Sequence, residues 1–321
     1  MKKIIAVIMF CGLASAQNGG PESQFKLMKS TSAAVRRAAV SDIGRMRQPS
    51  SVTILCEALE KDTDFGVRAQ AAEALGNMRS REAIPSLVKA LGDTNRNVRS
   101  AVIVAFGYIR DSKSVKPLTE YLKEEKDLGL QISALNVLGV IGSEEAAPAL
   151  IEMLESKNPR LSAIASQSLG RMRYSKAAQP LLKAAKNDNE SLRMAAIKAL
   201  GEIRNPDAVK PLEGMLEKEK SSEIKDAIVY SLAQLGSDKG FDIALAAAKS
   251  EDINTKRKGL RALGLMKKTT KEIEKIVLEA FQSPDRALKR DAESTASYLG
   301  IKLPAPEEEK KEIPQKPKSK K

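Results

Sequence analysis

Apolar positions recur along most of this chain with the spacing of one face of an α-helix, and each series ends at a glycine. The residue before that glycine is large and apolar, and a mostly small residue stands four positions earlier. In the first six segments Val or Leu stands four positions earlier again. Steps of four and four, followed by three to a Met or Ile beyond the glycine, follow one side of a helix, here called helix B. The glycines are Gly44, Gly76, Gly107, Gly139, Gly170, Gly201, Gly236, Gly264 and Gly300.

Successive glycines lie 28 to 36 residues apart, with a mean of 32. A fixed period in this range is typical of solenoid proteins. A second apolar helix, helix A, precedes each helix B, and a proline often stands near its start, where the missing N–H has no helical partner. These prolines are Pro85, Pro117, Pro148, Pro180 and Pro211. We interpret the glycines as helix C-termini.

The period predicts an all-α protein, a right-handed α-solenoid (superhelix) of about nine tandem two-helix repeats over residues 17–301. The segments DFGVRAQAAEALG (64–76) and NESLRMAAIKALG (189–201) resemble HEAT-like repeats of the phycobilisome-lyase type. The resemblance covers about residues 22–300. It implies a HEAT-repeat fold, and such repeats serve as scaffolds, lyase subunits and binding modules alike. The last three units depart from it, with Lys239 where earlier units have Arg and Asp291 at a usually apolar position.

The two ends of the chain differ from the repeats. A lysine pair, a short apolar run and an A-x-A motif predict a signal peptide at residues 1–16, cut after Ala16. A lipid anchor on Cys11 is the alternative, which the preceding Phe10 disfavours. The expected location is therefore periplasmic or extracellular. Residues 302–321 are rich in Pro, Lys and Glu and predict a disordered tail.

Composition argues against catalysis. The chain has no histidine, which removes the commonest general base and metal ligand. After signal cleavage Cys56 is the single cysteine, which excludes an internal disulfide and a Cys-based metal cage. We interpret it as a small buried hydrophobe, with a reactive thiol as the alternative. The sequence therefore predicts no enzyme, no cofactor and no metal site, and no transmembrane segment.

The net charge of +13 includes two rows of basic residues in register with the repeats. The first row stands eight positions before the glycine: Arg36, Arg68, Arg99, Arg193 and Lys256. An Asp or Asn four positions earlier would cap helix B, and an Asp there would pair with this basic residue. We interpret the first row as structural.

The second row stands three positions after the glycine, where helix B ends: Arg47, Arg79, Arg110, Arg173 and Arg204, with Lys267. Cations there interact favourably with the negative end of the helix dipole. The alternative is a stripe of guanidinium groups that binds an acidic protein or anionic polymer. Tyr108 and Tyr174 fall beside this row, and tyrosine next to arginine is typical of binding hot spots, although tyrosine at a repeat junction also packs. The five arginines and two tyrosines are the candidate partner-binding residues.

Three functions fit these features. The first is an exported, non-catalytic scaffold or adaptor that binds a protein or peptide through the concave face or edge of the solenoid. The second, which the resemblance implies, is an accessory lyase- or chaperone-like subunit acting on a partner protein. The third is a cell-envelope element that binds an anionic polymer. Nucleic acid is disfavoured, because an exported protein does not meet it and aromatic residues do not alternate with the basic ones.

Overall fold

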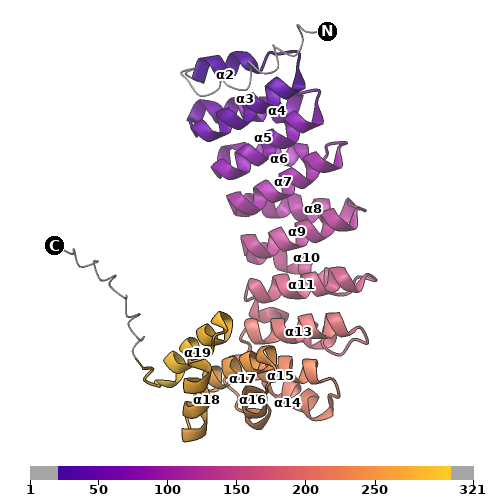
Figure 1. The fold of residues 1–321 in the computed structure, drawn as a ribbon. Helices are drawn as coiled ribbons and strands as arrows, with labels where there is room; N and C mark the ends of the chain where they lie inside the picture. The colour runs from indigo at the N-terminus through magenta and orange to yellow at the C-terminus, as the bar shows by residue number, and fades with distance from the viewer. Residues whose placement is uncertain (1–20, 305–321) are drawn as a thin grey trace, which may run out of the picture. The chain divides into compact units, whose positions relative to one another are not determined.

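The computed structural model describes residues 21–304, and all of their regular elements are helices. The expected signal peptide and most of the expected tail lie outside the described residues. The helices form two compact units, one up to Ala208 and one from Val209. Each unit consists of consecutive A–B helix pairs, which confirms the all-α repeat fold predicted from the sequence (Figure 1).

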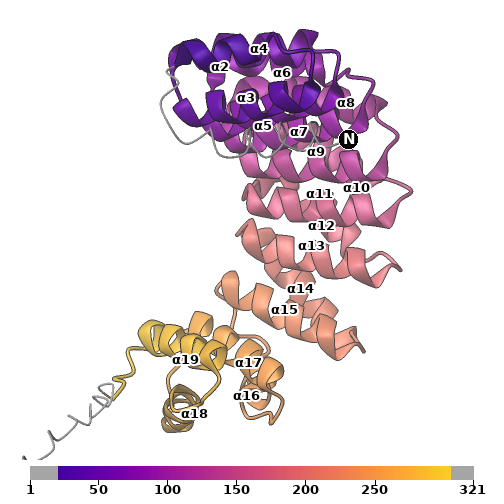
Figure 2. The ribbon, with the colours of Figure 1, turned by 45° about the horizontal axis from the view of Figure 1, so that its top comes forward.

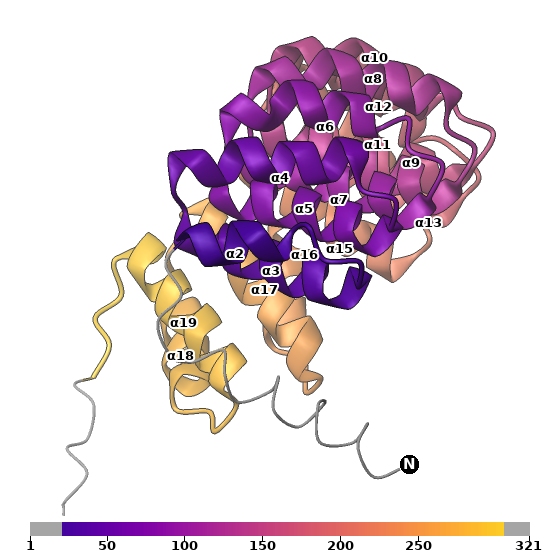
Figure 3. The same cartoon turned by 90° about the horizontal axis from the view of Figure 1, so that it is seen from above.

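The first unit contains six A–B pairs within its described part. Its A helices are α2 (Pro21–Leu27), α4 (Pro49–Lys61), α6 (Ile84–Ala90), α8 (Val115–Glu124), α10 (Ala147–Leu154) and α12 (Ala178–Ala184). Its B helices are α3 (Ala33–Met46), α5 (Phe65–Met78), α7 (Arg96–Ile109), α9 (Leu128–Ile141), α11 (Pro159–Arg171) and α13 (Glu190–Glu202). The short 3-10 turns are η1 (Arg81–Ala83), η2 (Ser112–Ser114), η3 (Glu144–Ala146), η4 (Ser175–Ala177) and η5 (Pro206–Ala208). Figure 3 shows the A helices as one layer and the B helices as the other.

The second unit contains three further A–B pairs. Its helices are α14 (Val209–Lys218), α15 (Ser222–Gln234), α16 (Phe241–Ala248), α17 (Ile253–Met266), α18 (Lys271–Phe281) and α19 (Arg286–Leu299). Within this unit α17 contacts α15, α16 and α19 (Figure 2).

Most B helices begin at an Asp or Asn whose side chain caps the first turn. The Asp64 carboxylate accepts a hydrogen bond from the Val67 N–H at 3.0 Å, and the Asn189 side chain accepts one from the Leu192 N–H at 3.0 Å. These bonds satisfy N–H groups that have no partner inside the helix. The capping role predicted for these residues is confirmed.

Seven of the nine recurring glycines lie inside a B helix, so interpreting them as helix C-termini is wrong. At six of them, Gly44, Gly76, Gly107, Gly139, Gly170 and Gly264, an added Cβ atom would lie 3.3 Å or less from an atom of the neighbouring B helix. A Cβ atom on Gly76 would lie 2.7 Å from the Ala105 Cα, and one on Gly139 would lie 2.8 Å from the Ser168 Cβ. Helix packing, rather than a special backbone conformation, therefore accounts for these glycines.

The other two glycines, Gly236 and Gly300, lie past the end of their helices with φ angles of 83° and 70°. The Ser237 N–H donates to the Leu232 carbonyl at 2.9 Å, in the same kind of bond that closes α5. The residue equivalent to the helix glycine is therefore Ala233 in α15, and by the same bond pattern it is Ser297 in α19.

This shift in register removes the irregularity of the repeat. With Ala233 and Ser297 in place of the two glycines, successive repeats are 31 to 33 residues long throughout. Lys239 and Asp291 depart from the repeat pattern when the last repeats are aligned on Gly236 and Gly300. Aligned on Ala233 and Ser297, neither residue occupies the position at which it departed. In the structure the Asp291 carboxylate pairs with Arg257 at 2.6 Å.

Candidate functional site

Each of the nine B helices is followed by one residue in the left-handed conformation. Glycine holds this position after α9, α15 and α19, at Gly142, Gly236 and Gly300. The other six repeats have the second basic row at this position, with φ between 49° and 55°. These residues are Arg47, Arg79, Arg110, Arg173, Arg204 and Lys267. The row predicted from the sequence does lie at the helix ends, but its backbone has the conformation that glycine adopts most easily.

A side chain at such a position has an energetic cost. The left-handed conformation brings Cβ close to the following carbonyl oxygen and costs about 1–2 kcal/mol for a residue other than glycine. A cation at the helix C-terminus recovers about 0.3–1 kcal/mol from the helix dipole. For the stability of the fold alone, glycine at this position is therefore better than arginine or nearly equal to it.

The arginine side chains of this row have no partner that would explain them. All five are exposed. None of them forms a hydrogen bond or ion pair with another described residue. Of the acids nearby, Asp111 pairs with Arg81 at 3.2 Å and Glu82 accepts a hydrogen bond from the Ser80 hydroxyl at 2.9 Å. Burial raises the pKa of the Glu202 carboxyl, while the charges of Arg171, Lys198 and Arg173 act to lower it. In the first unit the five guanidinium groups therefore form an exposed cationic edge without ion pairs to the described residues, which we call the arginine edge.

The first basic row has the opposite character in its first three members, Arg36, Arg68 and Arg99, whose side chains are largely buried and bond both to an acid and to a backbone carbonyl. Arg68 donates to both carboxylate oxygens of Asp93, at 2.7 and 2.9 Å. It also donates to the Asp62 carbonyl at 2.9 Å. The Asp62 carboxylate in turn accepts two bonds of 2.7 Å from Arg36. Each arginine thus links the turn that precedes its own helix to the turn of the next repeat.

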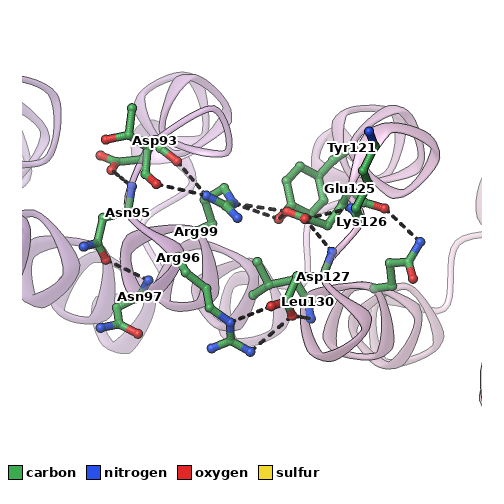
Figure 4. Close-up of polar contacts among 12 residues, drawn as sticks. Asp93, Asn95, Arg96, Asn97, Arg99, Tyr121, Glu125, Lys126, Asp127 and Leu130 are labelled. Carbon is green, nitrogen blue, oxygen red and sulfur yellow. Dashed lines mark hydrogen bonds and ion pairs between the residues drawn. The ribbon is translucent and has the colours of Figure 1, made fainter.

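The chain of bonds continues through the next repeat (Figure 4). Arg99 donates to the Asp93 carbonyl at 3.0 Å and to the Glu125 carboxylate at 3.1 Å. The longer Glu125 side chain also accepts a hydrogen bond from the Tyr121 hydroxyl. Gln131 replaces arginine in the fourth repeat and donates to the Glu125 carbonyl at 2.8 Å. We call this series, from Arg36 to Gln131, the ladder.

Ionisation states agree with this geometry. The hydrogen bonds from Arg36 hold the pKa of Asp62 below its ordinary value. Burial alone would raise the pKa of Asp93, but its hydrogen bonds with Arg68 and with the Asn95 N–H outweigh burial and lower it. Burial and the bond to Glu125 raise the pKa of Tyr121 to about 12. At neutral pH the acids of the ladder are therefore ionised and the tyrosine is protonated.

The structural role predicted for the first row is confirmed for its first three members, but the expected pairing is wrong. The capping Asp64 and Asn95 do not pair with the arginine four positions later. The partner is the acid two positions before the cap of the next repeat, as with Arg68 and Asp93. The reason is geometric, because a side chain that points across the stack reaches the neighbouring turn. Arg193 keeps the backbone part, with bonds of 3.0 and 2.9 Å to the carbonyls of residues 187 and 188.

Tyr108 lies on the exposed side of the B-helix layer, as the sequence suggests for a binding residue. Tyr108 is 49% exposed, and Val104, one turn earlier on α7, is 43% exposed. Both line a hollow between α5 and α7. The other lining residues are Glu73, Asn77, Asn97, Ser100 and Ala101.

A second hollow lies between α3 and α5 and includes Arg47 of the arginine edge. Its other lining residues are Ser41, Gly44, Arg45, Gln70, Ala74 and Asn77. Asn77 therefore borders both hollows. Sequence reasoning missed Asn77 and Val104, although Asn77 and Tyr108 share the position directly after the helix glycine. Tyr174 is half-buried at the start of η4 and lines neither hollow.

Other chemistry has little support among the described residues. Within residues 21–304, no cluster of three or more His, Cys, Asp or Glu side chains is placed to hold a metal ion. None of the helices in that range is long and apolar enough to cross a bilayer. Cys56 is half-buried, and burial raises the pKa of its thiol.

Two kinds of curated protein are similar to parts of this chain. A bilin biosynthesis protein, PecE, of Mastigocladus laminosus is 29% identical over 113 residues, which are 33% of this chain and 42% of that protein. The phycocyanobilin lyase subunit alpha of a Nostoc strain is 26% identical over 157 residues, 42% of this chain and 57% of the relative. A deoxyhypusine hydroxylase of Aspergillus clavatus is 38% identical over 86 residues, 26% of each chain. The matches span about half or less of these relatives.

Two solved structures are similar to the chain at low identity. The CpcE–CpcF complex of phycocyanin lyase from Nostoc is 21% identical, with 79% of this chain and 96% of that chain covered and a TM-score of 0.43. An engineered protein is 20% identical, with 88% and 89% covered and a TM-score of 0.47. The family model for HEAT repeats matches residues 25–104, 84–166 and 148–233, which together span more than half of the sequence. The chain belongs to the HEAT-repeat family.

Proposed function

We propose that this chain is an accessory subunit that binds a partner protein through the B-helix side of its first unit, along the arginine edge. The names of its relatives support an accessory role, because a lyase subunit acts together with other proteins. In this proposal the chain holds its partner, and any chemistry on the partner belongs to the complex. The scaffold function expected from the sequence is the part of this role that involves no chemistry.

The arginine edge is the observation that carries the proposal. Five arginines occupy positions where three other repeats have glycine, and their side chains form no hydrogen bond or ion pair with the described residues. A strained residue without an intramolecular partner favours a role toward another molecule. Exposed Tyr108 and Val104 beside the edge supply the aromatic and apolar contacts on which interfaces depend.

Photocrosslinking at two positions tests the proposal. A benzoyl-phenylalanine replacing Tyr108 should form adducts with the partner in cells that express the protein. The same group replacing Glu120, which is exposed on α8 in the A-helix layer, should not. Adducts of equal yield at both positions would contradict binding through the B-helix side.

The arginine edge is tested in the same experiment. Adducts from position 108 should be lost, by roughly tenfold or more, when Arg47, Arg79, Arg110, Arg173 and Arg204 are all replaced by glycine. Glycine is the matched replacement because three repeats already have it at this position. The loss of three to five exposed ion pairs of about 0.2–1 kcal/mol each accounts for a change of this size. An unchanged adduct yield would remove the arginine edge from the binding surface.

Export is a second part of the proposal and rests on the pattern of residues 1–16 alone. The mature protein should begin at Gln17, so that N-terminal sequencing of the recovered protein gives Gln-Asn-Gly-Gly. Intact mass on the same sample provides the control for further processing. A product that keeps residues 1–16, or a lipidated Cys11, would contradict soluble export.

A further inference from the structure

The arginine edge is interrupted, and the interruption limits what its partner can be. Arg47, Arg79 and Arg110 stand in three consecutive repeats. The fourth repeat has Gly142 at the same position, followed by the exposed carboxylates of Glu144 and Glu145. Along the edge, a uniformly anionic polymer would therefore meet a repeat that lacks the arginine and carries two acids two and three residues after Gly142. The charges therefore favour a partner segment whose acidic part ends where the third repeat ends.

The repeat spacing sets the spacing of the acids in such a segment. Neighbouring B helices pack about 8–10 Å apart, so successive arginines of the edge follow at roughly that interval. A peptide in the extended polyproline II conformation rises about 3.1 Å per residue and has three residues per turn, so every third side chain points to the same side. One carboxylate at about every third residue would therefore match the three arginines, and a segment of about seven residues would span them.

The hollows beside the edge supply the other contacts of a peptide. Asn77 is exposed, borders both hollows, and has no side-chain hydrogen bond within the described chain. A free amide offers one donor group and one acceptor, which suits a peptide backbone. Val104 and Tyr108 expose apolar surface one helical turn apart on α7, which suits one apolar side chain.

We propose that repeats one to three bind an extended acidic segment of the partner protein. Carboxylates at every third residue of this segment meet Arg47, Arg79 and Arg110, and one apolar side chain lies against Val104 and Tyr108. This inference rests on the proposed function and specifies the form of the partner. Recognition of an extended segment by alternating pockets and charges uses the long surface that stacked repeats present.

A synthetic peptide serves as the probe. It has seven residues, with Asp at the first, fourth and seventh positions, Leu at the fifth, and Gly or Ser elsewhere, and carries a fluorophore for anisotropy at low ionic strength. Two control peptides replace Asp by Asn or cluster the three Asp residues together. The probe should bind several-fold more tightly than either control. Equal binding of the clustered peptide would overturn the spacing argument.

Protein variants show which arginines of the edge the probe contacts. Replacing Arg47, Arg79 and Arg110 by glycine should weaken probe binding roughly tenfold, the sum expected from three exposed ion pairs. The matched control replaces Arg173 and Arg204 by glycine and should change binding less than about twofold, because the segment ends at repeat three. Tyr108→Ser should weaken binding of the Leu peptide but not of a peptide with Ser in place of Leu. Equal losses in the two arginine variants would overturn the proposed register.

A further experiment, with polyphosphate as the ligand, distinguishes an acidic peptide from an anionic polymer. Gly142→Arg extends the row by one repeat, in a conformation that arginine already adopts at five equivalent positions. It should leave probe binding unchanged. If long-chain polyphosphate binds more tightly than the probe and Gly142→Arg strengthens it, the edge binds polymer and the peptide proposal fails. If no probe binds while photocrosslinking from position 108 still yields adducts, the acidic segment is excluded and the proposed function stands.

Discussion

Replacing Arg68 by alanine is expected to lower the free energy of unfolding by about 3 kcal/mol, the cost of removing one partner from a largely buried ion pair. The Arg68 and Asp93 side chains are only 15% and 11% exposed. Without the arginine, the Asp93 carboxylate loses two hydrogen bonds and the Asp62 carbonyl loses one. Circular dichroism during denaturant titration measures the change.

Arg79→Ala is the matched control, because Arg79 lies at the other end of the same helix. Its side chain is exposed and has no partner among the described residues, so the expected loss is within about 0.5 kcal/mol. Equal losses for the two arginines would mean that the ladder and the arginine edge do not differ in the way their contacts indicate. A larger loss at Arg79 than at Arg68 would reverse the assignment of the two rows.

Gly76→Val is expected to destabilise the first unit by about 2–3 kcal/mol, because a side chain there must displace the neighbouring helix. The first added carbon alone would lie 2.7 Å from the Ala105 Cα, a backbone atom that cannot move without shifting α7. The two further methyl groups of valine increase the displacement. Thermal and denaturant unfolding both report the loss.

Adding a side chain at another glycine should have the opposite effect on stability. Gly214 lies in α14, is exposed, and would place a Cβ atom with no neighbour within 4 Å. Gly214→Ala should therefore raise stability by up to about 1 kcal/mol, the difference in helix propensity. Gly76→Ala should lower it, since the close contact outweighs the same gain. A stabilising effect at both glycines would show that close packing is not the reason for Gly76.

The repeat and its helices could be predicted because both depend on local periodicity. Apolar side chains at helical spacing fix the buried face, and Leu75 and Leu138 are indeed fully buried. The register of the last repeats could not be fixed in this way. A glycine inside a helix and a glycine in the left-handed turn three residues later look alike in the sequence, so Gly236, which does end its helix, was aligned with the helix glycines three residues out of register.

The pairing within the ladder was missed for a different reason. Sequence rules for ion pairs apply within one helix, whereas Arg68 reaches Asp93 in the next repeat. A signal was present, since an acid stands two residues before the cap at Asp62, Asp93 and Glu125. The left-handed conformation of the second row could also have been inferred from the sequence, because Gly142 holds the position that arginine holds in the neighbouring repeats.

The central claim is that the arginine edge is kept for a partner and not for the fold. The most direct test is the free energy of unfolding of the variant in which Arg47, Arg79, Arg110, Arg173 and Arg204 are all glycine, measured beside its crosslinking yield at position 108. Glycine relieves the left-handed strain at each site and gives up only the interaction with the helix dipole. We predict that stability is unchanged or higher while the crosslinks are lost. A fall in stability of more than about 2 kcal/mol, beyond what dipole interactions at exposed sites explain, would contradict the claim.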